Sequence, residues 1–159
     1  MVEQADLTTL LDRLVASGVE FILVGGLAAV AQGAPITTFD VDIVHERSPE
    51  NVDRLLAFLA TLNAHYRGRP GLPLPPDRSA LLGPGHSLFA TDLGSLDVLG
   101  AIEGGRNYET LVPSSVTVQI EGHSLRVLSL EMLTELKRGS SDPKDRLRLP
   151  VLEAALKKR

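Results

Sequence analysis

The sequence contains no cysteine and no tryptophan, and only 4% of its residues are aromatic. Without cysteine there is no disulfide and no thiolate-bound metal, a composition that fits a cytoplasmic protein. The few aromatic residues form no cluster on which nucleic-acid bases could stack. No run of 18 apolar residues is present, so we expect no transmembrane helix and no membrane partner. The polar, acidic N-terminus also lacks the pattern of a signal peptide.

Metal-binding histidine motifs are missing as well. The sequence has four histidines, each isolated, and none shows the spacing of a metal site: His45, His65, His86 and His123. We expect packing or surface roles for them, although His45 and His86 flank predicted strands and could line a cleft.

The 159 residues are 43% hydrophobic and 23% charged, which indicates one domain with its own core. Charge is distributed unevenly along the chain. Residues 137–159 hold eight basic and three acidic residues, whereas residues 1–136 hold eight basic and seventeen acidic ones. The basic segment either faces phosphates or RNA, or forms a solvated helical face. Charge alone leaves both interpretations open.

Apolar periodicity predicts an α/β (α+β) fold: a mixed, mostly short-stranded central sheet flanked by helices. The expected helices cover residues 6–17, 27–32, 48–62, 129–138 and 142–156. The expected strands cover residues 21–24, 38–44, 86–90, 95–99, 116–120 and 124–127. We expect a core over 1–128 and a C-terminal helical segment over 129–159, packed together as a single domain. Residues 66–85, rich in glycine and proline, form either a substrate-covering loop or a surface crossover.

Residues 21–44 carry the most informative pattern. An apolar strand ends in Gly25-Gly26, a short helix follows, and the next strand carries Asp40 and Asp42. Alternate residues of a strand face the same side, so these two acids project together, about 7 Å apart. Two carboxylates on one face repel each other, which suggests a bound cation. The glycine pair would let the backbone approach a phosphate. Taken singly, the glycines also fit a tight turn and the acids an exposed loop.

A third acid, Asp97, interrupts the apolar strand at 95–99. By itself it fits an edge-strand or turn residue. The order glycine pair, Asp40-x-Asp42 and later Asp97 resembles the nucleotidyltransferase superfamily, whose best-known member is DNA polymerase β. Three segments carry the resemblance: Val24-Gly25-Gly26, Asp40-Val41-Asp42 and Leu96-Asp97-Val98. Three further segments are similar to stand-alone prokaryotic proteins of the abortive-infection (AbiEii-type) toxin branch: Arg126 to Leu133, Leu136-Lys137 and Pro143-Lys144-Asp145. The resemblance covers residues 19–156, apart from the proline-rich loop.

The resemblance implies an enzyme of the nucleotidyltransferase class (EC 2.7.7 type), with the nucleotidyltransferase fold. It would move NMP from an NTP, such as ATP, to a hydroxyl on RNA (for example tRNA), a protein or a small molecule. A role as the toxin of a toxin–antitoxin pair, with an antitoxin partner, is also implied. Mg²⁺, or Mn²⁺, would bind the three catalytic carboxylates: Asp40, Asp42 and Asp97. Five residues would bind the nucleotide: Gly25, Gly26, Lys137, Lys144 and Asp145.

The sequence departs from this branch at two places. Residues 36–39, Ile-Thr-Thr-Phe, lack an arginine that often precedes the acid pair, and Arg148 replaces a further aspartate. These departures motivate an alternative: a catalytically weakened module on the same fold that binds a nucleotide or a partner. A dinucleotide-binding Rossmann domain is a third interpretation. It is disfavoured because G-x-G-x-x-G is absent and because the ribose requires one acid rather than three.

Overall fold

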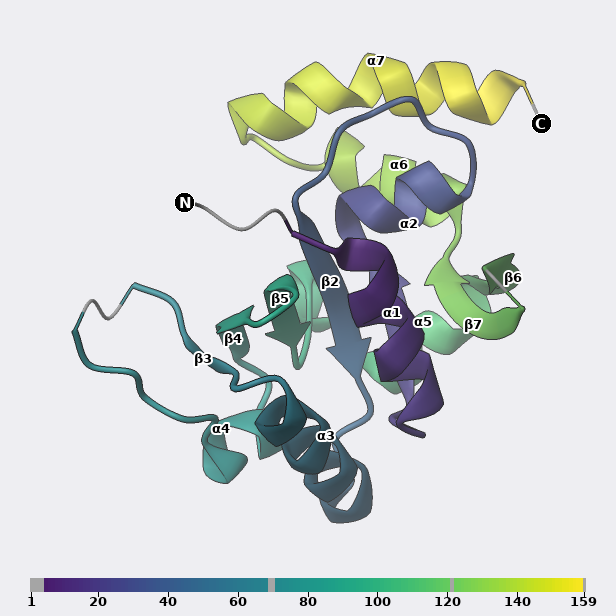
Figure 1. Ribbon diagram of the computed structural model, residues 1–159. Helices are drawn as coiled ribbons and strands as arrows, with labels where there is room; N and C mark the ends of the chain where they lie inside the picture. Colours follow the sequence, from purple (N-terminus) through teal and green to yellow (C-terminus); the bar gives the residue numbers. More distant parts are fainter. Residues whose placement is uncertain (1–4, 69–70, 121, 159) are drawn as a thin grey trace.

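In the computed structural model, which describes residues 5–68, 71–120 and 122–158, seven strands form one mixed sheet (Figure 1). The strand order is β3-β4-β5-β2-β1-β7-β6. The strands are β1 (Phe21–Val24), β2 (Asp40–His45), β3 (His65–Tyr66), β4 (His86–Thr91), β5 (Gly94–Leu99), β6 (Ser115–Ile120) and β7 (His123–Leu128). The helices are α1 (Leu7–Ala16), α2 (Gly25–Ala31), α3 (Pro49–Thr61), α4 (Arg78–Leu82), α5 (Tyr108–Leu111), α6 (Leu130–Arg138) and α7 (Pro143–Lys157), with 3-10 turns η1 (Glu103–Gly105) and η2 (Val112–Ser114).

Parts of four predicted features lie outside the described residues. These parts are the N-terminal residues 1–4, positions 69–70 of the proline-rich segment, Glu121 between the predicted strands 116–120 and 124–127, and Arg159 of the basic segment 137–159.

The middle of the sheet mixes both strand directions. β1 pairs antiparallel with β2 and parallel with β7, while β2 pairs parallel with β5. The predicted mixed sheet flanked by helices is therefore confirmed. The Rossmann alternative is wrong, because its mononucleotide-binding halves are built from parallel strands.

The strands at the centre form because their residues are apolar on both faces. All four residues of β1 are buried, and Val41, Ile43 and Val44 of β2 are fully buried. Such continuous apolar runs are typical of strands covered on both sides. The polar residues of β2 are its two acids, which are only partly exposed, and His45 at its end, which is buried.

A buried asparagine fixes the ends of β1 and β2 that lie away from those acids. Asn51, in the first turn of α3, accepts a hydrogen bond from the Glu20 amide at 2.8 Å. Its Nδ2 donates to the carbonyl oxygens of Glu20 and Glu46, at 3.0 and 2.7 Å. Ser48 caps the same helix by accepting from the Asn51 amide. The structure therefore confirms the helix start that was predicted at Ser48-Pro49.

Several predicted boundaries differ from the structure. The glycine pair lies inside the first turn of α2 rather than ahead of a helix over 27–32. β2 begins at Asp40, two residues later than predicted. The proline-rich segment holds a short helix, α4, and α7 continues through Pro150 to Lys157. In the part of the chain that the structure describes, no helix is both long and apolar enough to cross a bilayer.

The two C-terminal helices, α6 and α7, lie near α2, the helix that precedes the acid-bearing strand β2. α7 packs on α6, and α6 packs on α2. In Figure 1, α7 runs across the top of the molecule, and the connection from α2 to β2 rises beside it. This arrangement brings basic residues near the C-terminal end of the chain close to the glycine pair.

Candidate active site

The parallel pairing of β2 with β5 brings two of the three predicted acids together. Asp42 is the register partner of Asp97, whereas Asp40 is opposite Ser95. Register partners on neighbouring strands have side chains on the same face of the sheet. Asp40, two residues before Asp42, is on that face as well. All three carboxylates therefore project from one side of the sheet, with Asp42 and Asp97 adjacent.

The Asp42 carboxylate occupies an unfavourable electrostatic environment. Its Oδ1 atom is buried, and within the described part of the chain no hydrogen-bond donor reaches it. Burial, the neighbouring Asp97 carboxylate and, less strongly, the charge of Asp40 raise the pKa of Asp42 to about 7. A nearby positive charge, Arg67, opposes this increase only in part. A carboxylate held in this state is stabilised by any cation that reaches it.

Arg67 supplies one such positive charge from the end of β3. Its Nη2 atom lies 2.7 Å from Asp97 Oδ1, and its Nη1 donates to the Phe89 carbonyl oxygen at 2.9 Å. The side chain of Asp97 is 18% exposed and that of Arg67 is 31% exposed, so the pair is only partly screened by water. Arg67 thus neutralises the Asp97 side of the acid pair.

Gly25 lies directly against the Asp42 carboxylate. Its φ is +71°, in the left-handed region that favours glycine. A Cβ atom at this position would overlap Asp42 Oδ2 and lie 3.0 Å from Asp42 Cγ. The glycine is therefore required both by its backbone conformation and by the close approach of the acid.

A cavity of about 130 Å³ joins this acid to the C-terminal region. Its lining residues come from β1, α2, β2, β5, η1, α6 and the segments beside them: Val24, Gly25, Asp42, Leu99, Ile102, Glu103, Leu128, Leu133, Leu136 and Lys137. Three of the residues predicted for the site, Asp42, Gly25 and Lys137, thus line one cavity. Glu103 is an additional acid in its wall. Most of the other lining side chains are apolar, which favours a ligand partly shielded from water.

Lys137 is held in place by a neighbouring acid. Its Nζ lies 2.8 Å from Asp145 Oδ1, and Ser140 Oγ donates to Asp145 Oδ2 at 2.6 Å. Burial tends to raise the pKa of Asp145, but the hydrogen bonds from Lys137 and Ser140 and the charges of Lys137 and Arg148 outweigh it, so the pKa is lowered. Asp145 therefore acts on Lys137, as a positioning residue, and does not line the Asp42 cavity.

Lys144 lies elsewhere. It lines a separate hollow of about 360 Å³ on α7, together with Asp142, Asp145, Leu147 and Arg148. Of the nucleotide-binding residues expected from the sequence, Gly25 and Lys137 share the cavity with Asp42, and Gly26 is adjacent. Lys144 is not brought to the acids in this structure.

The acid pair meets the chemical requirements of a divalent cation. Carboxylate oxygens are the ligands that Mg²⁺ prefers, and Mg²⁺ usually takes only one or two of them and completes its shell with water and substrate phosphate. Among the described residues, no group of three or more His, Asp or Glu side chains is arranged to hold a metal ion. The buried Oδ1 of Asp42 beside Asp97 fits a two-carboxylate site.

Two residues of this region, Arg67 and Glu103, were not predicted from the sequence as site residues. The contact of Arg148 with the glycine pair was not predicted either. Arg67 is followed by the proline-rich segment, and its partner Asp97 is 30 positions away, so no local pattern identifies the contact. Glu103 follows β5 by a few residues, and only the path of the chain after that strand brings it to the cavity.

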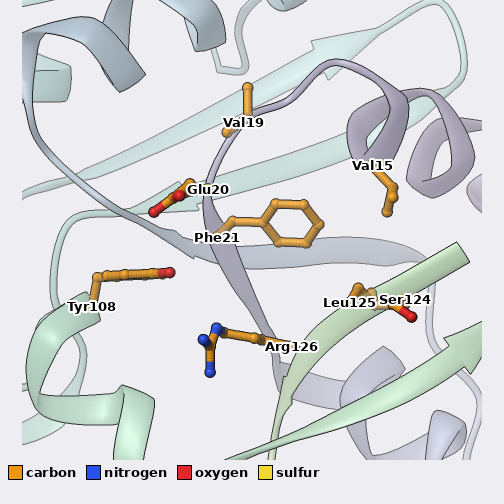
Figure 2. A pocket seen from close by; sticks show the side chains of 8 residues that line it. All are labelled: Val15, Val19, Glu20, Phe21, Tyr108, Ser124, Leu125 and Arg126. Carbon is orange, nitrogen blue, oxygen red and sulfur yellow. The ribbon is translucent and has the colours of Figure 1, made fainter.

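A third hollow, of about 250 Å³, lies at the opposite end of β1 (Figure 2). Tyr108, Glu20 and Arg126 surround it, over an apolar wall that includes Phe21. Phe21 precedes Val24 by three residues, about 10 Å along the strand. Because this hollow lacks the adjacent acids, we assign the candidate active site to the Asp42 cavity.

No protein-family model matches the sequence, and no curated protein matches it significantly. Solved structures, in contrast, share the fold over nearly the whole chain. The protein has the nucleotidyltransferase fold.

Three of these structures illustrate the match. A Thermotoga maritima protein proposed to be a nucleotidyltransferase is 20% identical, with 96% of this chain and 91% of that one covered and a TM-score of 0.56. The lincosamide antibiotic adenylyltransferase LnuA, bound to lincomycin, is 14% identical, with coverages of 96% and 99% and a TM-score of 0.62. ANT(2″)-Ia, in complex with adenylyl-2″-tobramycin, is 16% identical, with coverages of 94% and 89% and a TM-score of 0.61. At these identities the likeness establishes the fold.

Replacing Gly25 by alanine tests the contact between the glycine and the acid. We expect Gly25→Ala to lower the free energy of unfolding by at least about 2 kcal/mol more than Gly33→Ala does. Gly33 is a matched control, because its φ is +98° but an added Cβ would meet nothing within 4 Å. Urea denaturation followed by circular dichroism measures both. Removing the acid as well, in Gly25→Ala/Asp42→Ala, should reduce the extra cost. Equal costs for the two single variants would contradict the contact.

The raised pKa of Asp42 predicts a pH-dependent stability in the presence of a chelator. Between pH of about 4, where the carboxyl ionises in the unfolded chain, and about 7, the folded protein holds a proton that the unfolded chain has lost. The free energy of unfolding should therefore fall as pH rises through this window. We expect Asp42→Asn to remove about 2 kcal/mol of that decrease, measured by urea denaturation at several pH values.

Asp77→Asn is the control for this measurement, since Asp77 is exposed and its side chain caps no helix. Its pH profile should follow that of the wild type. Identical slopes for wild type and Asp42→Asn would show that Asp42 is already ionised throughout the window.

Proposed function

We propose that this protein is a nucleotidyltransferase that transfers NMP from an NTP to a hydroxyl group of an acceptor, with Mg²⁺ or Mn²⁺ as cofactor. One observation carries the proposal: Asp42 and Asp97 lie side by side on neighbouring strands, and Gly25 packs directly against Asp42. The same fold in two adenylyltransferases, LnuA and ANT(2″)-Ia, supports it.

Each residue of the site has a role in this reaction. The acceptor hydroxyl oxygen forms a bond to the α-phosphorus, the bond from that phosphorus to the pyrophosphate oxygen breaks, and pyrophosphate leaves. Asp42 and Asp97, with Asp40 beside them, would hold the divalent cation, which supplies neutralisation of phosphate charge when bound. Asp97 is assigned to the acceptor side, where a carboxylate accepts the hydroxyl proton.

The glycines and the lysine serve the nucleotide. Without a side chain, Gly25 lets the β- and γ-phosphates approach its backbone at the cavity, and Gly26 follows it, buried, in the first turn of α2. Lys137, fixed by Asp145 at 2.8 Å, presents a positive charge to the same cavity. Holding the triphosphate and acceptor in line is the main contribution that such residues make to the rate.

A small molecule is the acceptor class that the neighbouring structures favour, because those of LnuA and ANT(2″)-Ia contain lincomycin and adenylyl-2″-tobramycin. RNA such as tRNA, a protein acceptor, the toxin role and an antitoxin partner follow from the sequence resemblance alone. The acceptor panel in the experiment below therefore contains all three classes.

The test is a transfer assay with each α-labelled NTP in Mg²⁺ or Mn²⁺, using total tRNA, a protein extract, and a set of lincosamide and aminoglycoside antibiotics as acceptors. We expect label on one acceptor class, and a loss of about 1,000-fold or more in Asp42→Asn and in Asp97→Asn. Asp77→Asn, the exposed control, should retain wild-type activity.

Two results would count against the proposal. NTP binding with no transfer to any class would support the alternative of a binding module on the same fold. Transfer that survives both Asp42→Asn and Asp97→Asn would place the reaction at another site.

A further inference from the structure

Strand β6 ends the sheet on one side, and among the described residues β7 is the one element that packs extensively on it. In Figure 1, β6 lies at the right-hand margin of the molecule. The opposite edge, β3, is only two residues long, and the Tyr66 amide on it donates to the Leu74 carbonyl oxygen of the following segment. Short or covered edges resist pairing with another chain, whereas long bare edges favour it. With six residues, β6 is the edge that is open to a partner strand.

The hydrogen bonds between β6 and β7 determine which backbone groups of β6 point outward. The Ser129 amide donates to the Ser114 carbonyl oxygen at 2.9 Å, one register step before the first residue pair of β6 and β7. Hydrogen-bonded and non-hydrogen-bonded pairs alternate in an antiparallel ladder, so the even-numbered residues of β6 bond to β7. The amides and carbonyls of Thr117 and Gln119 therefore point away from the sheet. Within the part of the chain that the structure describes, these backbone groups have no hydrogen bond to another element.

The side chains of β6 suit contact with a copy of the same strand. Its sequence, Ser-Val-Thr-Val-Gln-Ile, carries no charge, so pairing about a two-fold axis brings no like charges together. Val116, Val118 and Ile120 lie on one face of the strand because alternate residues share a face. Val116 is 37% exposed, and the other two are partly buried against the core. Charged residues and proline, which protect exposed edges in other proteins, are absent from β6.

We propose that β6 is a dimer interface, in which it pairs antiparallel with β6 of a second copy of this chain about a two-fold axis at Val118. In this register, Thr117 of each copy is opposite Gln119 of the other. Every outward amide of these two residues then donates to an outward carbonyl oxygen of the other copy. Val118 faces its own copy, and Val116 faces Ile120, so the apolar side chains of both copies form one stripe on one face of the joined sheet.

The neighbouring register fits less well. A two-fold axis at Thr117 would place Ser115 opposite Gln119. The Ser115 amide already donates to the Val112 carbonyl oxygen, so that register would leave the Gln119 carbonyl oxygen without a donor. An axis at Val118 has no such cost. The dimer also leaves the candidate active site uncovered, because β1 and β7 separate β6 from the acid-bearing strand β2. Pairing through one edge strand buries little surface, so we expect the dimer to be weak.

Sedimentation velocity between about 1 and 500 µM protein tests the dimer, for which we expect a Kd on the order of 10 to 100 µM. Thr117→Pro should raise this Kd at least about tenfold, because proline removes an outward N–H and its ring blocks the edge. Since the Thr117 amide does not bond to β7, proline there removes no hydrogen bond of the sheet. Thr117→Val is the matched control: it keeps the amide and should dimerise like the wild type. Circular dichroism checks the fold of each variant.

Cysteine cross-linking tests the register, because the sequence contains no cysteine of its own. In Val118→Cys the two sulfur atoms face each other at the axis, where the Cα atoms of a non-hydrogen-bonded pair lie about 4.5 Å apart, within the range of a disulfide. We expect this variant to form a disulfide-linked dimer at least about tenfold faster than Thr117→Cys, whose cysteines are offset along the strand. If Thr117→Pro does not fold, this comparison decides.

Three results would overturn the assignment: a wild-type protein that stays monomeric over the whole concentration range, a folded Thr117→Pro that dimerises like the wild type, or cross-linking of Thr117→Cys as fast as that of Val118→Cys. The proposed function does not depend on this interface, and its transfer assay would be unaffected by any of the three.

Discussion

Repulsion between the carboxylates of Asp42 and Asp97 is the constraint around which the site is built. The parallel register of β2 and β5 places the two acids side by side, and burial raises the pKa of Asp42 to about 7. Arg67 compensates the charge on the Asp97 side, and Gly25 leaves the space that the Asp42 carboxylate fills. The arrangement is costly without a cation and favourable with one. That balance is what links the fold to the proposed chemistry.

Much of the fold was predictable because local patterns determine it. The apolar runs of β1 and β2, the Ser48-Pro49 helix start and the alternation that puts Asp40 and Asp42 on one face all depend on residues close in sequence. The position of Asp97 opposite Asp42 required more. It depends on the pairing of two strands about 55 residues apart in the sequence. The resemblance to nucleotidyltransferases suggested this pairing, and the alternation within either strand could not specify it.

The remaining features could not be predicted because they depend on tertiary packing. The Arg67–Asp97 pair requires β3, β4 and β5 to be neighbours, and the contact of Arg148 with the glycine pair requires α7 to fold back over α2. From the sequence, Arg148 and residues 36–39 were two separate departures from the family pattern. The structure brings them into contact through Thr37. Lys144, which matches the family pattern, lines a hollow on α7 that Arg148 also borders, away from the Asp42 cavity.

The central claim is that Asp42 and Asp97 together hold a divalent cation. Crystals grown with Mn²⁺ and a non-hydrolysable NTP analogue, measured at the manganese absorption edge, test it most directly. We predict an anomalous peak between the two carboxylates, with an oxygen of the triphosphate completing the coordination, and no such peak in Asp42→Asn crystals. Nucleotide bound in the cavity with no manganese at the acid pair, or manganese retained there in Asp42→Asn, would contradict the account.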